Sequence, residues 1–212
     1  MTQIAFLLYD QMTALDAVGP YDVLARLPGA EVKFVASTPG PVQTDVGMVL
    51  FADSPLDAVP APDIVLVPGG PGTRKALEDS AAVEWLRRAH ETSRWTTSVR
   101  TGSLVLGAAG IPAGKQATSH WIVRDRLRDF GAEPVSERVV VDGKVITAAG
   151  VSSEIDMALT LAAQEADEDT ARMLQLAIEY DPQPPFDSGS LEKADAETRE
   201  RATRYFAPAT AA

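Results

Sequence analysis

The sequence of 212 residues contains no cysteine and only two histidines, His90 and His120. The absence of cysteine excludes disulfide bonds, thiolate metal ligands and a cysteine nucleophile. Two histidines offer little material for a zinc site, so we expect no bound metal. A Ser-His-Asp triad would have to use one of the same two side chains. The composition therefore leaves few routes to covalent catalysis.

Positive charge and long apolar runs are also scarce. Lysine and arginine number 19 against 30 aspartates and glutamates, which gives a net charge of −11. Because phosphate groups bind to basic surfaces, we expect neither nucleic acid nor an anionic membrane as a partner. We find no apolar run of about 18 residues and no basic leader, so we expect a cytoplasmic protein. Apolar residues make up 45% of the chain, which is typical of a globular fold.

Segments of strand composition alternate with segments of helical composition through most of the chain. Four apolar or β-branched segments have the length of strands: 4–9, 31–37, 63–67 and 96–99. Residues 14–24 are predicted to be a loop that passes into a helix with Pro20 near its start. Further helices are predicted at 73–78, 81–93, 101–109, 123–130 and, as one long helix, from about Glu154 towards Tyr180. This alternation predicts an α/β fold, a flavodoxin-like three-layer sandwich with a mostly parallel central sheet and helices on both faces.

Two pairs of short extended segments are typical of hairpins. The dipeptide Asp142-Gly143, between 138–141 and 144–147, is a strong signal for a tight turn between two strands. A smaller hairpin is predicted around Gly47. We expect each pair to be antiparallel.

The end of the chain differs in composition from the rest. Residues 181–186 form a proline-rich strap, and residues 190–206 form a charged helix with few apolar anchors. We therefore predict an α/β domain of residues 1–186 and a C-terminal helical tail of residues 187–212. Such a tail is either a partner-binding arm or a frayed terminus. Aromatic residues favour the arm, since they are enriched at contact surfaces; they are Tyr180, Phe186, Tyr205 and Phe206.

A β-branched run changes abruptly into a small-residue helix at Arg100. Residues 95–110 read WTTSVRTGSLVLGAAG. Strand-to-helix elbows of this kind usually hold a reactive side chain over the carboxyl edge of a sheet. A guanidinium stays protonated and cannot act as a nucleophile. Ser103, one turn further on, is more typical of a packing or capping hydroxyl.

Three motifs carry a family resemblance: LDAVGPYDVL at 15–24, VPGG at 67–70 and SVRTGSLVLGAAG at 98–110. Segments 117–121 and 149–159 fit the same pattern. Together they resemble the DJ-1/PfpI superfamily, and within it most closely the isonitrile hydratases, over about residues 4–186. The resemblance implies a small-molecule substrate and a homodimer.

The resemblance also implies roles for individual positions. In that family the elbow residue is a cysteine that attacks the isonitrile carbon, and an acidic residue near the first helix holds and protonates it. The acidic position corresponds to Asp16. The oxyanion-type donors correspond to Gly69, Gly70 and the amide of Thr101. The cysteine position corresponds to Arg100, so the cysteine-dependent mechanism is not available to this chain.

Asp16 and Arg100 are expected to face each other across the pocket. A guanidinium favours the charged form of a neighbouring carboxylate and can donate two parallel hydrogen bonds, so we predict a lowered pKa for Asp16. Two interpretations stay open. Either Arg100 fills the pocket and neutralises Asp16, or Arg100 binds an anionic or carbonyl group while Asp16 acts as base or hydrogen-bond acceptor.

Two further residues belong to the predicted site. His120 lines the pocket in the family pattern, although a hydrogen-bonded residue behind the pocket is the favoured interpretation. Glu154 begins the long helix, at a position where the family commonly has a small residue. Its charge either stabilises the helix N-terminus, by roughly 0.3–1 kcal/mol, or supplies a second carboxylate partner for Arg100.

The sequence leaves two functions open. One is an isonitrile-hydratase-like protein that uses cysteine-independent acid–base or electrostatic chemistry of hydratase, lyase, isomerase or cyclase type on a small polar or anionic substrate. The alternative is a catalytically inactive relative that binds a small anionic metabolite or a protein partner. A regulatory ligand sensor is disfavoured, because no DNA-binding module follows and the charge is acidic. No cofactor is expected, since the glycines at 69–72 lack the context of a dinucleotide site.

Overall fold

The computed structural model describes residues 1–210, with side chains up to residue 206. Its centre is a seven-stranded sheet in the order β10-β11-β7-β6-β1-β2-β5. The strands are β1 (Thr2–Leu7), β2 (Ala30–Ala36), β5 (Ser54–Pro55), β6 (Ile64–Val67), β7 (Trp95–Val99), β10 (Val139–Asp142) and β11 (Val145–Ala148). All neighbouring strands are parallel except β10 and β11, which form an antiparallel hairpin. The mostly parallel sheet predicted from the sequence is confirmed.

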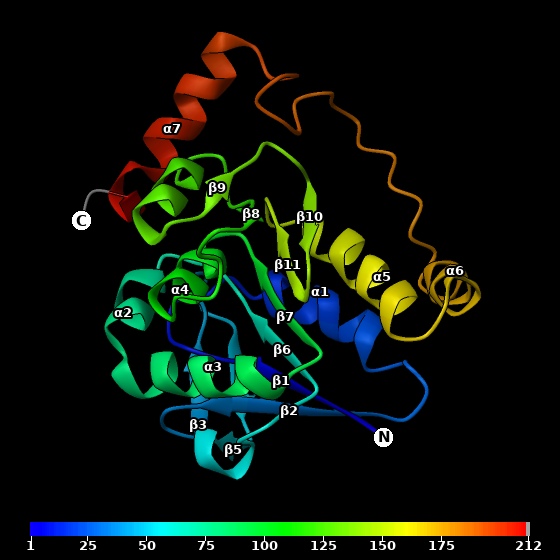
Figure 1. Ribbon diagram of the computed structural model, residues 1–212. Helices are drawn as coiled ribbons and strands as arrows, with labels where there is room; N and C mark the ends of the chain where they lie inside the picture. The colour runs from blue at the N-terminus through cyan, green and yellow to red at the C-terminus, as the bar shows by residue number, and fades with distance from the viewer. Residues whose placement is uncertain (211–212) are drawn as a thin grey trace.

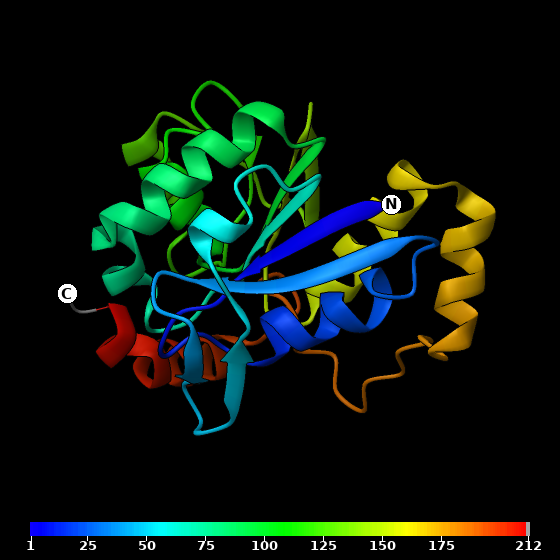
Figure 2. The same ribbon diagram turned by 90° about the horizontal axis from the view of Figure 1, so that it is seen from below.

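Helices cover both faces of this sheet, as Figures 1 and 2 show. One face carries α1 (Leu15–Leu24), α5 (Ser153–Glu165) and α6 (Glu168–Ala177). The other carries α2 (Thr73–Glu78), α3 (Ser80–Thr92) and α4 (Gly102–Ala108). The three-layer α/β sandwich is therefore confirmed.

The central strand β1 shows why the sheet needs both helical layers. Ile4 and Phe6 are buried against the α1 and α5 side, and Ala5 and Leu7 against the α3 and α4 side. Successive side chains of a strand point to opposite faces. A strand covered on both faces therefore consists of continuous apolar residues, as this one does.

Several short strands and helices lie outside the three-layer sandwich. A hairpin of β3 (Gly40–Gln43) and β4 (Val49–Ala52) projects from the body, and Figure 2 shows it next to α1. A second small sheet pairs β8 (Gln116–Ala117) with β9 (Glu133–Pro134). Two short helices, η1 (Leu56–Ala58) and η2 (Arg124–Phe130), have 3₁₀ geometry. Both hairpins predicted from the sequence are confirmed.

Two predicted helices differ from the structure. The long helix expected from Glu154 is two helices, because Asp167 caps the start of α6 by accepting a hydrogen bond from Thr170 N at 2.7 Å. The first helix begins at Leu15, so Pro20 lies in its interior and not near its start. This boundary places Asp16 in the first turn of α1, directly at the carboxyl edge of the sheet.

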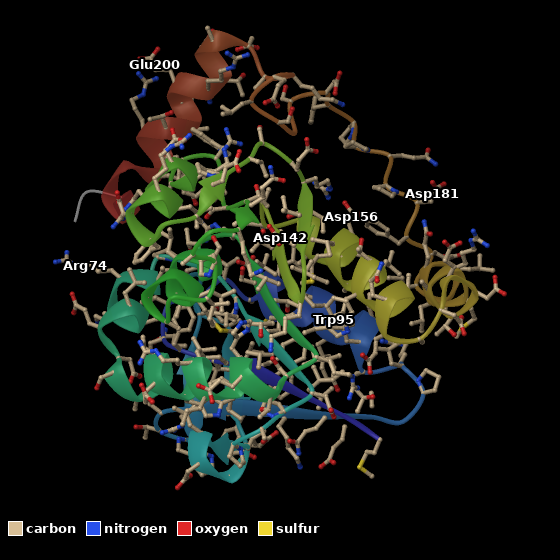
Figure 3. All side chains as sticks on the ribbon, viewed as in Figure 1. Arg74, Trp95, Asp142, Asp156, Asp181 and Glu200 are labelled. Carbon is tan, nitrogen blue, oxygen red and sulfur yellow. The ribbon has the colours of Figure 1, made fainter. Side chains whose placement is uncertain are left out.

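The tail returns to the body of the protein. An extended strap of residues 178–195 leaves α6 and leads to α7 (Ala196–Thr210), which lies beside η2 in Figure 1. Asp181 on the strap and Glu200 on α7 lie at the outer edge of the molecule (Figure 3). The helix predicted from residue 190 thus begins later, and the end of the predicted tail of residues 187–212 lies outside the described residues. No described helix has the length and apolar character needed to cross a membrane.

Candidate functional site

The elbow between β7 and α4 is held in a strained backbone conformation. Arg100 has a φ of 55°, in the left-handed region that residues with a Cβ adopt at a cost of roughly 1–2 kcal/mol. Its amide donates to Ala148 O of β11 at 2.9 Å. Its carbonyl accepts hydrogen bonds from the hydroxyls of Ser103 at 3.0 Å and Ser119 at 2.9 Å. Three neighbouring segments therefore fix the turn.

Two glycines allow the elbow to lie directly against the end of β6. A Cβ at Gly102 would lie 2.2 Å from Val67 O, and a Cβ at Gly69 would lie 2.6 Å from Thr101 N. Any larger residue would collide with backbone atoms that cannot move independently. Close backbone contact therefore explains both the Pro-Gly-Gly turn and the glycine after the elbow.

The Arg100 side chain points into the protein and is only 5% exposed. Its Nη1 donates to Thr13 Oγ1 at 2.7 Å, and the Thr13 hydroxyl donates in turn to Asp45 Oδ2 at 2.7 Å. The guanidinium carbon lies 5.5 Å from the ring centroid of Phe206, which is a cation–π distance. The buried Nε has no hydrogen-bond acceptor among the described residues. The guanidinium is thus a fixed charge whose Nε donor is left unused among these residues.

The carboxyl group of Asp16 is fully buried beside Arg100. Its Oδ2 accepts a hydrogen bond from Gly69 N at 2.9 Å, and its Oδ1 has no partner in the described part of the chain. Burial raises the pKa of Asp16 to about 7, although Arg100 and the Gly69 amide oppose the shift. The predicted lowering of this pKa is wrong, because no direct ion pair joins Asp16 to Arg100 in residues 1–206, and desolvation outweighs the remaining attraction.

Glu154 is also fully buried, in the first turn of α5. Its carboxyl group packs against Gly19 of α1, and neither of its oxygens has a hydrogen-bond partner among the residues described. Burial raises its pKa to about 8, and the charge of Asp16 adds to the shift while Arg138 opposes it. No ion pair joins Glu154 to Arg100 in this part of the structure, so the predicted carboxylate–guanidinium partnership is wrong. Glu154 neighbours Asp16 instead.

The amides predicted to form an oxyanion hole are partly used inside the protein. Gly69 N donates to Asp16, and Gly70 N donates to Thr101 Oγ1 at 2.8 Å. That hydroxyl also lies 2.7 Å from Thr73 Oγ1. The two glycine amides therefore hold the carboxyl group and the elbow in place, rather than pointing at open space.

His120 lies in the same region as Arg100 and is 6% exposed. Its ring stands 5.4 Å from that of Trp121 and 5.1 Å from that of Phe206. Burial, with a contribution from Arg100, lowers the pKa of His120 to about 4, so the ring is neutral at pH 7. No cluster of three metal-ligating side chains occurs in the described residues.

The tail covers this group of residues through one narrow stripe. In the described side chains of α7, only Ala202 and Phe206 are half-buried and the others are exposed. Because these two residues are four apart, they share one face of the helix. Before α7, the strap at 189–192 leaves a cavity of about 220 Å³ between itself and the body. The cover is therefore loosely packed, although it buries Arg100.

Several residues of the site were not singled out by the sequence. Three of them carry hydroxyl groups and lie near the glycine turn and the first helix: Tyr9, Thr13 and Thr73. The fourth is Asp45, from the β3–β4 turn. The Tyr9 hydroxyl donates to Pro68 O at 2.6 Å. Thr13 and Thr73 stand next to the recognised motifs in the sequence, so their position was a usable signal. Asp45 carried no such signal.

Similar proteins share this architecture. The model of the DJ-1/PfpI family matches residues 2–164. An isonitrile hydratase of Pseudomonas putida is 45% identical over 97% of this chain and 90% of its own length. A glutathione-independent glyoxalase of Caenorhabditis elegans is 31% identical over 66% of this chain and 75% of its own. The crystal structure of a ThiJ/PfpI family protein from Pseudomonas syringae superposes with a TM-score of 0.96 at 38% identity, covering 99% of this chain and 87% of the other.

These similarities agree with the motifs and with the fold. The resemblance to isonitrile hydratases extends over nearly the whole chain, and the chain has no cysteine that could take the place of the residue at the elbow. The segment that matches the family model, residues 2–164, contains the central sheet, the glycine turn and the strained elbow. The chain therefore belongs to the DJ-1/PfpI family, and it carries Arg100 at the strand-to-helix elbow.

Proposed function

We propose that the protein is an isonitrile-hydratase-like enzyme that works without a cysteine, through proton transfer by Asp16 next to the fixed charge of Arg100. The substrate class is a small polar or anionic molecule, and hydration of an isonitrile that carries a carboxylate fits it best. The similarity to an isonitrile hydratase over 97% of the chain supports the reaction type. The side chains of Asp16 and Arg100 support a mechanism that needs no cysteine.

One observation carries this proposal. The Asp16 carboxyl has a free Oδ1 and a pKa raised to about 7 by burial. General acids and bases work best when their pKa lies near the operating pH. An exposed aspartate, with a pKa near 4, would be ionised and could not donate a proton.

The proposed step balances without a covalent intermediate. Asp16 gives its proton to the terminal carbon of the isonitrile, water adds its oxygen to that carbon, and a proton of the water returns to Asp16. The immediate product is the N-substituted formimidic acid, and transfer of its hydroxyl proton to the nitrogen gives the N-substituted formamide. Arg100 holds the substrate's carboxylate through the guanidinium donor that has no acceptor among the described residues. Phe206 must move aside for a substrate to reach the guanidinium, because the ring centroid lies 5.5 Å from the guanidinium carbon.

The test uses isocyanoacetate, a small isonitrile with a carboxylate. Formamide production is followed by NMR for the wild-type protein, for Asp16→Asn and for the control Asp22→Asn, an exposed residue of the same helix. We expect Asp16→Asn to lose about 100-fold or more in rate while retaining isocyanoacetate binding. The control should match the wild type. A wild-type protein that binds isocyanoacetate and never converts it would overturn the enzymatic proposal.

The alternative function is a binding protein without catalysis. The closed site favours it, because Phe206 covers Arg100 and His120, and the amides of Gly69 and Gly70 are already used. In that case a small anion or a protein partner would displace α7. Binding of isocyanoacetate equal in the wild type and Asp16→Asn, with no turnover in either, is the result that identifies this alternative.

We also propose a homodimer. Exposed apolar side chains gather on α1 and on the adjoining β3–β4 hairpin, whose turn is joined to the start of α1 by the hydrogen bond from Asp45 N to Met12 O at 3.0 Å. The patch consists of Leu15, Val18, Tyr21, Val46, Met48, Val49 and Phe51. Apolar patches of this kind mark contact surfaces.

Light scattering during size-exclusion chromatography tests the dimer. Phe51→Glu, at a position that is 64% exposed, should give a monomer. Val141→Glu on the opposite edge strand should not change the mass. A wild-type monomer would contradict the proposal. A cytoplasmic location, without nucleic acid or membrane as a partner, stays a prediction from the composition.

A further inference from the structure

Two carboxyl groups are buried close to each other without a cation bound to either. Asp16 and Glu154 are both completely buried. Three of their four oxygens, Asp16 Oδ1 and both oxygens of Glu154, make no hydrogen bond among the described residues. A buried carboxylate without partners is very unfavourable, so such a group keeps its proton.

The packing of α1 against α5 brings these groups together. The head of Glu154 occupies the space that a side chain at residue 19 would fill, since a Cβ on Gly19 would lie 2.7 Å from Glu154 Oε1. Gly19 follows Asp16 by three residues, about one turn, and residues at this spacing lie on the same face of a helix. Figures 1 and 2 both show the two helices side by side. Glycine at position 19 therefore makes room for a second carboxyl beside Asp16.

The other charged groups near this pair have partners of their own. Arg100 and Asp45 face Asp16, and Arg100 donates to Thr13. Arg138 and Asp156 face Glu154 from the other side. They form an ion pair with each other.

Arg138 is occupied by a second contact as well. Its Nη2 donates to the carbonyl of Ser152 at 2.7 Å. The guanidinium is therefore held at the N-terminal end of α5 and makes no ion pair with Glu154 in the part of the chain described. Among the described acidic groups, the charge of Asp16 makes the largest contribution that raises the pKa of Glu154, ahead of Asp156.

We propose that Asp16 and Glu154 form a coupled carboxyl pair that holds a proton in the site at neutral pH, with Glu154 as a positioning residue that retains its proton when Asp16 loses one. The inference rests on the proposed role of Asp16 and deepens it. Two interacting carboxyls lose their protons in two separate steps that belong to the pair. After the first step, the charge of Asp16 stabilises the remaining proton on Glu154.

A carbon-13 NMR titration of the side-chain carboxyls tests the pair directly, without any substrate. In the wild-type protein both carboxyls should titrate near or above neutral pH. In Asp16→Asn the charge that holds the proton on Glu154 is gone, so the midpoint of Glu154 should fall by about one pH unit. In Glu154→Gln one of the two steps should disappear while Asp16 still titrates.

A matched control separates coupling from a general change of charge. Asp45→Asn removes a carboxylate that faces Asp16 but not Glu154. It should lower the midpoint of Asp16 and leave that of Glu154 in place. An unchanged midpoint of Glu154 in Asp16→Asn would overturn the inference. So would a wild-type Glu154 that titrates with an ordinary midpoint, a result that needs no variant to fold. The titration needs no turnover, so it tests the carboxyl pair even if the proposed reaction does not occur.

Discussion

The elbow and the tail meet at the contact between Arg100 and Phe206, but they are held in opposite ways. The elbow is fixed by hydrogen bonds from three segments and by glycines at which a Cβ would lie within 3 Å of neighbouring backbone atoms. Helix α7 of the tail contributes one stripe of half-buried residues, and the strap before it spans a cavity. The body of the protein builds the site, whereas α7 only closes it. Changes in the two regions should therefore have very different effects.

The largest effect is expected from filling the close contact at the elbow. Gly102→Ala places a Cβ at 2.2 Å from Val67 O, whereas a Cβ at Gly189 in the strap meets no atom within 4 Å. We expect Gly102→Ala to reduce the free energy of unfolding by about 3 kcal/mol, the upper range for overpacking. Gly189→Ala should change it by less than about 0.5 kcal/mol. Urea unfolding measures both, and equal losses would refute the contrast.

The next effect is the dependence of stability on pH. The pKa values of Asp16 and Glu154 are raised in the folded state to about 7 and about 8. The folded protein therefore keeps protons that the unfolded chain releases above its ordinary carboxyl range. The stabilisation is complete below that range and is lost as the pH rises through 7 and 8.

Asp16→Asn should make this loss smaller. Between about pH 5 and pH 8, we expect the free energy of unfolding of the wild type to fall by about 2 kcal/mol more than that of the variant. Denaturant titrations at several pH values measure the difference. Parallel curves for the two proteins would show that the Asp16 carboxyl titrates in its ordinary range.

A smaller effect is expected from the hydroxyls that support the elbow. Ser119 donates to the Arg100 carbonyl from a fully buried position, so Ser119→Ala should cost about 1 kcal/mol. Ser136 lies at the wall of the cavity under the strap, and its hydroxyl interacts at the surface. Ser136→Ala should be neutral within about 0.5 kcal/mol. Thermal unfolding of the two variants decides whether the support is concentrated at the elbow.

The smallest effect on stability is expected from removing α7, the last helix of the tail. A chain that stops after Asp195 loses the contacts of α7 and should lose less than about 1 kcal/mol, because few side chains of this helix are buried. Its affinity for isocyanoacetate should rise, since Phe206 no longer covers Arg100. Calorimetry measures both quantities. A large loss of stability would show that the tail is part of the folding unit.

The sequence predicted the scaffold better than the contacts within the site. The apolar run at 4–9 and the Asp142-Gly143 turn specified local structure, because their signals are short-range. The pKa of Asp16 was predicted in the wrong direction, because a motif identifies the neighbours of a carboxyl group but not its loss of water. The sequence left Glu154 with two roles, at the helix N-terminus or beside Arg100, and indicated neither its burial nor its contact with Gly19, which lies 135 residues earlier (154 − 19).

The contribution of the tail was equally difficult to foresee. Phe206 was recognised as an aromatic residue suited to a contact surface, yet the surface it contacts is the protein's own site. No motif indicates which residues the Phe206 ring contacts, since the strap before α7 has no regular structure that determines its path. Packing over long sequence separations decides such contacts.

The left-handed backbone at residue 100 has a further consequence for how this scaffold can change. The strain arises from the Cβ and the backbone, and neither arginine nor cysteine is branched at Cβ. The two residues therefore place a similar demand on the turn. The backbone of the elbow can thus keep its conformation while the side chain at residue 100 is exchanged. In such a fold, a single substitution can replace a nucleophile by a permanent charge. The reaction at the elbow can therefore change while the backbone around it stays the same.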